Sequence, residues 1–76
     1  MALQISVSPI EDAWVVRSDS FENDLVFQKG GRAEAAARSL ADRYARAGRS
    51  AEVSIFLRDG ALAGRFLHAA RQMEGA

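Results

Sequence analysis

The chain has 76 residues, of which 49% are hydrophobic and 26% charged, a balance that fits neither a disordered nor a membrane-spanning chain. It has no cysteine, which excludes disulfides, thiolate nucleophiles and cysteine-ligated metal sites. Its ten basic and ten acidic residues cancel, but residues 1–28 hold one arginine against five acidic residues, whereas residues 29–49 hold six basic against two acidic ones. The sequence therefore predicts one small domain with an acidic first part and a basic helix.

Three strands are predicted before the helix. Residues 3–8 alternate between apolar and polar types, as a half-buried strand does, and Pro9 ends the strand because it has no N–H to donate. This alternation differs from the basic start and long apolar block of a signal peptide, so we expect a cytoplasmic protein. Residues 13–18 are rich in aromatic and β-branched types, and residues 24–28 form a short third strand.

An alanine-rich helix is predicted to follow and to reach residue 47. Its apolar residues have the spacing of one helix face, namely Ala33, Ala37, Leu40, Ala41 and Tyr44. Gly31 is expected to cap the helix, which places Glu34 at the third helical position. Gly48 is expected to end it.

Two further strands complete the domain. Residues 52–58 alternate strongly, Asp59-Gly60 is a strong two-residue hairpin signal, and residues 61–67 return as the partner strand. We expect a domain over residues 1–68 and a frayed or disordered tail over residues 69–76. The order β-β-β-α-β-β predicts an α+β fold, with an antiparallel sheet and one helix packed on one face.

Several stretches in this order match a known pattern: Val7-Ser-Pro9, Trp14-Val-Val-Arg17, Phe27, Glu34-Ala35, Leu40-Ala41 and Val53 through Gly60. They resemble a family of small bacterial domains of unknown function, numbered 2188 in that series. Gly30-Gly31 departs from the threonine cap of that family, and Leu57 departs from its usual glycine. The resemblance implies the α+β fold. The family has no established activity, so the resemblance implies no catalytic residues.

No group of residues in the sequence points to a reaction. His68 is the only histidine, and without a second ligand type beside it the sequence predicts neither a metal site nor a nucleophile–base pair. The acidic residues between positions 11 and 24 match no calcium loop, and Gly30-Gly31 lacks the lysine of a phosphate-binding loop. We therefore expect no enzyme, no cofactor and no catalytic or metal-binding residue.

The predicted strands have apolar residues on both faces, although one helix can cover only one face. The larger set is expected to lie under the helix: Trp14, Val16, Val53, Ile55 and Leu57. The other face would present a patch of apolar residues and arginines: Val15, Arg17, Phe56, Arg58, Arg65 and Leu67. Such residues are enriched at protein interfaces. The sequence therefore predicts a small interaction module that forms a homodimer or binds a protein partner through its open sheet face, against the alternative of scattered surface side chains.

The helix arginines support a second hypothesis, weak nucleic-acid binding. They are Arg32, Arg38, Arg43, Arg46 and Arg49, which together could contact phosphates. Glu34 and Asp42 interrupt this surface, and solubility and the helix dipole also account for arginines there. No contact with a membrane is expected, because no apolar run is long enough to cross one.

Overall fold

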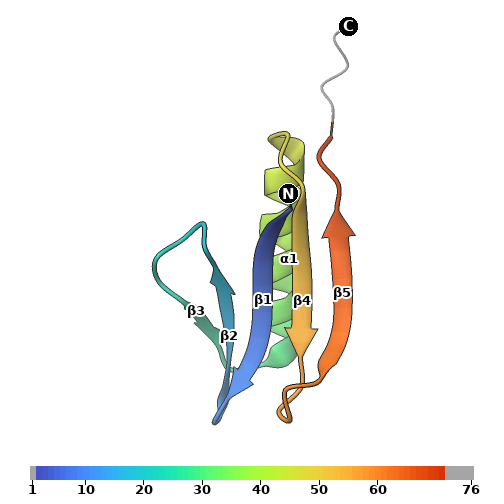
Figure 1. Ribbon diagram of the computed structural model, residues 1–76. Helices are drawn as coiled ribbons and strands as arrows, with labels where there is room; N and C mark the ends of the chain where they lie inside the picture. The colour runs from blue at the N-terminus through green and yellow to red at the C-terminus, as the bar shows by residue number, and fades with distance from the viewer. Residues whose placement is uncertain (1, 72–76) are drawn as a thin grey trace, which may run out of the picture.

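We describe a computed structural model of the chain over residues 2–71. Its elements, in chain order, are β1 (Leu3–Ile10), β2 (Ala13–Ser18), β3 (Leu25–Phe27), α1 (Gly30–Arg46), β4 (Ala51–Phe56) and β5 (Leu62–His68). The predicted order of elements is confirmed, as is the α+β fold with one helix on one face of a five-stranded sheet (Figure 1).

The pairing of the sheet is mixed, which corrects the antiparallel sheet that we predicted. The strand order is β3-β2-β1-β4-β5, and the central strands β1 and β4 run parallel, from Leu3 opposite Ala51 to Val7 opposite Ile55. The other three pairs are antiparallel. The parallel pair follows from the connection, because α1 returns the chain so that β4 runs in the direction of β3, which is also the direction of β1. Such crossovers are almost always right-handed, which determines the face that the helix covers.

The core lies between the sheet and α1. Its strand residues Ile5, Val7, Val16 and Val53 are at most 1% exposed, and each contributes about 1.5–3 kcal/mol by burial. The helix meets them with four buried alanines at every fourth position, Ala33, Ala37, Ala41 and Ala45. Because alanine is small, the helix lies close to the sheet, and larger side chains close the margins of the core: Trp14, Phe27, Tyr44 and Phe66.

Glycines mark both ends of the helix. The helix begins at Gly30 and its N-cap is Lys29, which corrects the predicted cap at Gly31. Gly30 lies against Trp14, where a Cβ atom would come within 2.9 Å of the indole Cε2 atom. At the other end Gly48 has a φ of 92° and donates its N–H to the Ala45 carbonyl at 3.1 Å, so the predicted stop is confirmed.

The last hairpin has a three-residue loop, which corrects the predicted two-residue turn. The Leu57 N–H donates to the Ala61 carbonyl at 2.8 Å, which closes the loop around residues 58–60. Gly60 has the predicted positive φ, at 88°. The Asp59 Oδ1 atom accepts a hydrogen bond from the Ala61 N–H at 2.9 Å. We had expected Leu57 to lie under the helix. It lies instead beside this loop and is 48% exposed.

The chain after β5 is bound to the end of the helix. The Ala70 N–H donates to Ser50 Oγ at 2.8 Å, and the Arg71 N–H donates to the Ala45 carbonyl at 2.9 Å. Residues 69–71 of the expected frayed tail are therefore anchored. Residues 72–76 of that tail lie outside the described residues.

Candidate functional site

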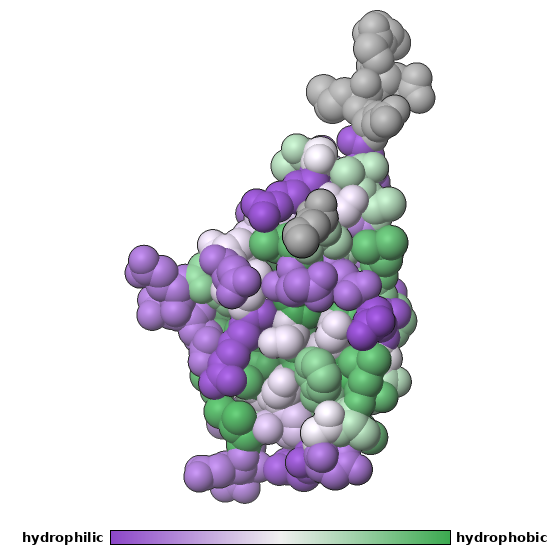
Figure 2. Space-filling view, in the orientation of Figure 1, coloured by the Kyte–Doolittle hydropathy of each residue, from purple (hydrophilic) through white to green (hydrophobic). Residues whose placement is uncertain are grey.

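The face of the sheet opposite α1 is organised as rows of side chains that cross the strands. One row lies in register across four strands and consists of Arg65, Ser54, Ser6 and Arg17. A neighbouring row consists of Leu67, Glu52 and Gln4. Figure 2 views this open face and shows hydrophobic residues along the margin over β5, whereas the loop on the opposite side is hydrophilic. The open face therefore has a polar centre and an apolar margin.

Four of the six residues predicted for the interface lie together on this face with their side chains wholly or partly in solvent: Arg17, Phe56, Arg65 and Leu67. Leu67 is the most exposed large apolar residue within residues 2–71, at 63%. Val15 also lies on this face but is only 1% exposed, contrary to the expectation that it contacts water. It lies between Ser8 and Val26 of the adjacent strands, which flank it on both sides.

Arg58, the sixth predicted residue, lies beyond the end of β4. Its Nη1 atom donates a hydrogen bond of 2.8 Å to the carbonyl oxygen of Glu11. Glu11 is in the turn between β1 and β2 and has a φ of 43°. Arg58 therefore joins two turns at one end of the sheet.

The two arginines of the open face have acidic neighbours in their own chain. Arg17 Nε is 2.8 Å from Asp24 Oδ2, and Arg65 Nε is 3.6 Å from Glu52 Oε1. The arginine side chains remain 56% and 59% exposed. Exposed pairs of this kind contribute only about 0–1 kcal/mol, so both guanidinium groups keep most of their capacity to bind a partner.

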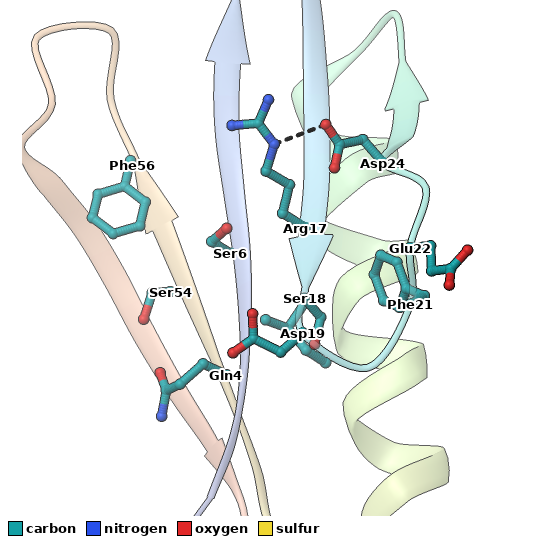
Figure 3. A pocket seen from close by; sticks show the side chains of 11 residues that line it. Gln4, Ser6, Arg17, Ser18, Asp19, Phe21, Glu22, Asp24, Ser54 and Phe56 are labelled. Atoms are coloured by element: carbon teal, nitrogen blue, oxygen red, sulfur yellow. Dashed lines mark hydrogen bonds and ion pairs between the residues drawn. The ribbon is translucent and has the colours of Figure 1, made fainter.

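A shallow depression of about 360 Å³ lies on this face beside the loop between β2 and β3 (Figure 3). The loop supplies an acidic wall, and the strands supply a polar floor; the lining includes Gln4, Ser6, Arg17, Asp19, Glu22 and Phe56. The loop is fastened to the helix by Tyr44, whose hydroxyl donates a hydrogen bond of 2.8 Å to Ser20 Oγ. The wall of the depression is therefore held in place.

Two features of this face were missed from the sequence. A bulge beside Ile55 and Phe56 brings Leu62, 44% exposed, opposite Phe56. Gly64 was the only signal for it, because a glycine inside a strand often marks a bulge. The polar centre was also missed, although the alternation of residues 3–8 already placed Ser6 on the face away from the core.

Two of the five helix arginines form ion pairs with acidic residues of α1. Arg38 lies 3.6 Å from Glu34, and its guanidinium carbon is 4.5 Å from the centre of the Phe66 ring. Arg46 pairs with Asp42 at 2.9 Å. The side chains of these two arginines are 47% and 65% exposed, so, like the two arginines of the open face, they form weak exposed pairs and stay accessible.

The remaining three, Arg32, Arg43 and Arg49, are exposed, and no ion pair is found for them among the described residues. Arg32 lies in the first turn of α1 and Arg43 in its last turn, about 16 Å further along the axis. Arg49 follows the helix. The exposed positive charge is therefore concentrated at two ends of α1.

Within residues 2–71, no three side chains of histidine, cysteine, aspartate or glutamate lie close enough together to hold a metal ion. His68 is half-buried opposite Ala51. The helix of this part of the chain is too short and too polar to cross a membrane.

The chain matches no protein-family model, no curated protein and no solved structure. The resemblance to family 2188 gains no support from these comparisons.

Proposed function

We propose that this protein is a non-catalytic interaction module of the cytoplasm, which receives a protein partner on the open face of its sheet and also associates with a second copy of itself. The observation that supports this most is the exposure of Leu67, which is 63% exposed on the open face, the same face as Phe56 and Arg65. Exposed apolar residues beside arginine and aromatic side chains are typical of protein-binding surfaces.

The two halves of the face suggest what the partner offers. The apolar margin consists of Phe56 on β4 and of Leu62 and Leu67 on β5, which would anchor apolar side chains of the partner. The depression has Asp19, Glu22 and Asp24 against a single arginine, Arg17, and so favours a basic side chain. A partner with an apolar strip next to a lysine or arginine would match both.

Affinity enrichment from the native cell with matched variants tests this proposal. Phe56→Glu places a charge within the apolar margin, and Ala35→Glu places the same charge on the exposed side of α1. We expect the partner to be retained by the wild type and by Ala35→Glu and to be lost by Phe56→Glu, with all three proteins folded by circular dichroism. A partner that Phe56→Glu retains would contradict a role for the open face.

Weak nucleic-acid binding through the helix arginines is the second candidate, and the exposure of Arg32, Arg43 and Arg49 favours it. It is the weaker proposal, because Glu34 and Asp42 lie among these arginines and lower the net positive charge of the helix surface. Retention on a polyanion column separates the two. Phosphate contacts would weaken steeply between about 50 and 200 mM salt, and Arg43→Ala would lower retention while Phe56→Glu would not.

A further inference from the structure

The exposed apolar residues of this protein gather at the edges of the sheet. Of the six large ones among the described residues, two lie on β3 (Leu25 and Val26) and two on β5 (Leu62 and Leu67). An edge strand also presents unpaired N–H and C=O groups to a neighbour. The edges of this sheet therefore combine apolar side chains with free backbone groups.

The two edges differ in how they are protected. β3 has only three residues, and shortness is itself a common protection against pairing. β5 has seven residues, contains no proline, and has one charged side chain, Arg65, which lies near Glu52 of the inner neighbour. In Figure 1 the outer side of β5 faces no other element of the described chain. β5 is thus a long and open edge.

We infer that a second copy of this chain pairs antiparallel with β5 across a two-fold axis, which extends the five-stranded sheet to ten strands. This inference rests on the self-association in the proposed function and names the surface that mediates it. The dimer uses Leu67 and Arg65 at the outer margin of the open face, and Phe56, Leu62 and the polar centre of that face stay accessible to the protein partner.

Charge selects the register of this pairing. Side chains alternate between the two faces along β5. In the paired strands, odd-numbered residues of one copy must therefore lie opposite odd-numbered residues of the other, so that the open faces of both copies are on the same side. An axis at Arg65 would place two arginines directly opposite each other, which is destabilising. An axis at Phe66 instead places Arg65 opposite Leu67 of the second copy and pairs five residues of each strand, whereas an axis at Leu67 would pair only three before β5 ends at His68. The axis at Phe66 is therefore the register that we assign.

Both faces of β5 suit this arrangement. On the helix side Phe66 is half-buried beneath Arg38, and its ring would meet the Phe66 ring of the second copy at the axis. On the open face Leu67 would be covered by the alkyl part of Arg65 from the second copy. Glu52 lies opposite Leu67 on its other side, which keeps a carboxylate within reach of that arginine. Each copy thus supplies both halves of the contact.

Association through one edge strand buries little surface. Interfaces at the small end of the size range are weak, so we expect a dissociation constant on the order of micromolar or above. Sedimentation of the full chain over a concentration series that reaches hundreds of micromolar is therefore the appropriate measurement, and we expect the mass to rise toward that of a dimer.

Charge substitutions at Leu67 test the register by the sign of their effects. Leu67→Arg places like charges opposite each other twice in the dimer and should weaken association by roughly two- to thirty-fold, whereas Leu67→Glu should strengthen it by a similar factor. The stability of the single chain should change in the opposite direction, because Glu52 lies opposite position 67 on β4. An arginine there attracts Glu52 and stabilises the fold, whereas a glutamate repels it and destabilises the fold. Association and folding are thus separated. Weaker association in both variants would overturn the register.

Engineered cysteines give a second test, because the chain contains none of its own. Directly opposite residues have Cα atoms about 4.5–5.5 Å apart, within the range for a disulfide, whereas residues displaced by two positions lie beyond about 7 Å. A mixture of Arg65→Cys and Leu67→Cys should therefore form a covalent dimer between unlike variants, and each variant alone should not. Cross-linking of Arg65→Cys with itself would contradict the axis at Phe66.

Phe56→Glu distinguishes failure of this inference from failure of the proposed function. Phe56 is on β4, away from the edge, so we expect this variant to keep the dimer. If Phe56→Glu dissociates the dimer, the open face mediates self-association and the β5 inference is overturned while the proposed open-face role stands. A wild-type chain that stays monomeric throughout the series overturns the β5 inference and leaves partner binding to be judged by the enrichment experiment.

Discussion

On β1, Val7 is completely buried beneath the helix, whereas the residue before it, Ser6, lies on the open face between Ser54 and Arg17. Odd and even positions of β2 and β4 also alternate between the two faces, but Val15 and Ser54 are buried on the open face as well. On the covered face, aliphatic side chains of the strands pack closely against the alanines of α1. The open face is serine, arginine and glutamine with an apolar margin. Most of the fully buried side chains therefore lie on the covered face, and on the open face burial is confined to Val15 and Ser54.

Exchanging the chemistry of neighbouring residues on β1 should break this contrast most strongly. Val7→Ser removes buried methyl groups and buries a hydroxyl, and should lower the free energy of unfolding by about 2–4 kcal/mol. Ser6→Val changes the open face and should alter it by no more than about 0.5 kcal/mol. Urea unfolding followed by Trp14 fluorescence measures both. Similar losses in the two variants would show that the open face is also a core.

Buried and exposed alanines on α1 allow the same substitution to be compared on the two sides of the helix. Ala41 is fully buried against the sheet, so Ala41→Leu overfills the contact and should destabilise by about 1–3 kcal/mol. Ala35 lies on the exposed side of the same helix, and Ala35→Leu should change stability by less than about 0.5 kcal/mol. Thermal unfolding compares them. Tolerance of leucine at position 41 would mean that the helix does not lie close to the sheet.

The two glycines in the first turn of α1 lie in different surroundings, because Gly30 faces the sheet and Gly31 faces solvent. Gly30→Ala brings a methyl group against the rigid indole of Trp14 and should destabilise by about 0.5–2 kcal/mol, with a shift of the tryptophan emission. At Gly31 an added Cβ would meet no atom within 4 Å, so Gly31→Ala should stabilise by about 0.5–1 kcal/mol through helix propensity. Effects of the same sign at both positions would contradict the close approach at Gly30.

The smallest effect is expected on the open face. A double-mutant cycle with Arg17→Ala and Asp24→Ala should give a coupling of about 0.2–1 kcal/mol, because the pair is exposed. The coupling should fall as salt is raised, since ions screen exposed charges. A coupling that is large and independent of salt would indicate that this part of the face is shielded from solvent.

Local patterns in the sequence predicted each element because each has its own signal. The alternation in residues 3–8 predicted β1, the spacing of the alanines predicted α1, and Gly48 predicted its end. The prediction that Pro9 ends β1 was wrong: the strand continues to Ile10, with Pro9 paired to Trp14 on β2 beyond the last β4 partner at Val7. The pairing of β1 with β4 has no such signal, since parallel neighbours are chosen by the path of the chain. Burial of Val15 also depends on neighbours, because the pattern shows its face and not the strands that flank it.

The candidate site was predicted in outline and not in detail. Phe56, Arg65 and Leu67 share the open face as their alternation indicated, because strand periodicity determines side-chain direction. The position of Arg58 depends on the length of the hairpin loop, and its hydrogen bond to Glu11 joins two turns that are distant in the sequence. Leu62 lies on this face because of a bulge, and Gly64 was its only signal in the sequence.

The parallel pair at the centre of the sheet has a consequence for the order of events during synthesis. β1 is synthesised before the other strands of the described chain, yet it pairs on one side with β4. Leu3 can therefore pair with Ala51 only after Ala51 has left the ribosome. The hairpin of β1 and β2 can form early, but it lacks the strand that completes its core. Pairing of this kind raises contact order, which slows folding of a short chain. The nascent protein should therefore gain resistance to proteases late and in one step, when β4 docks beside β1.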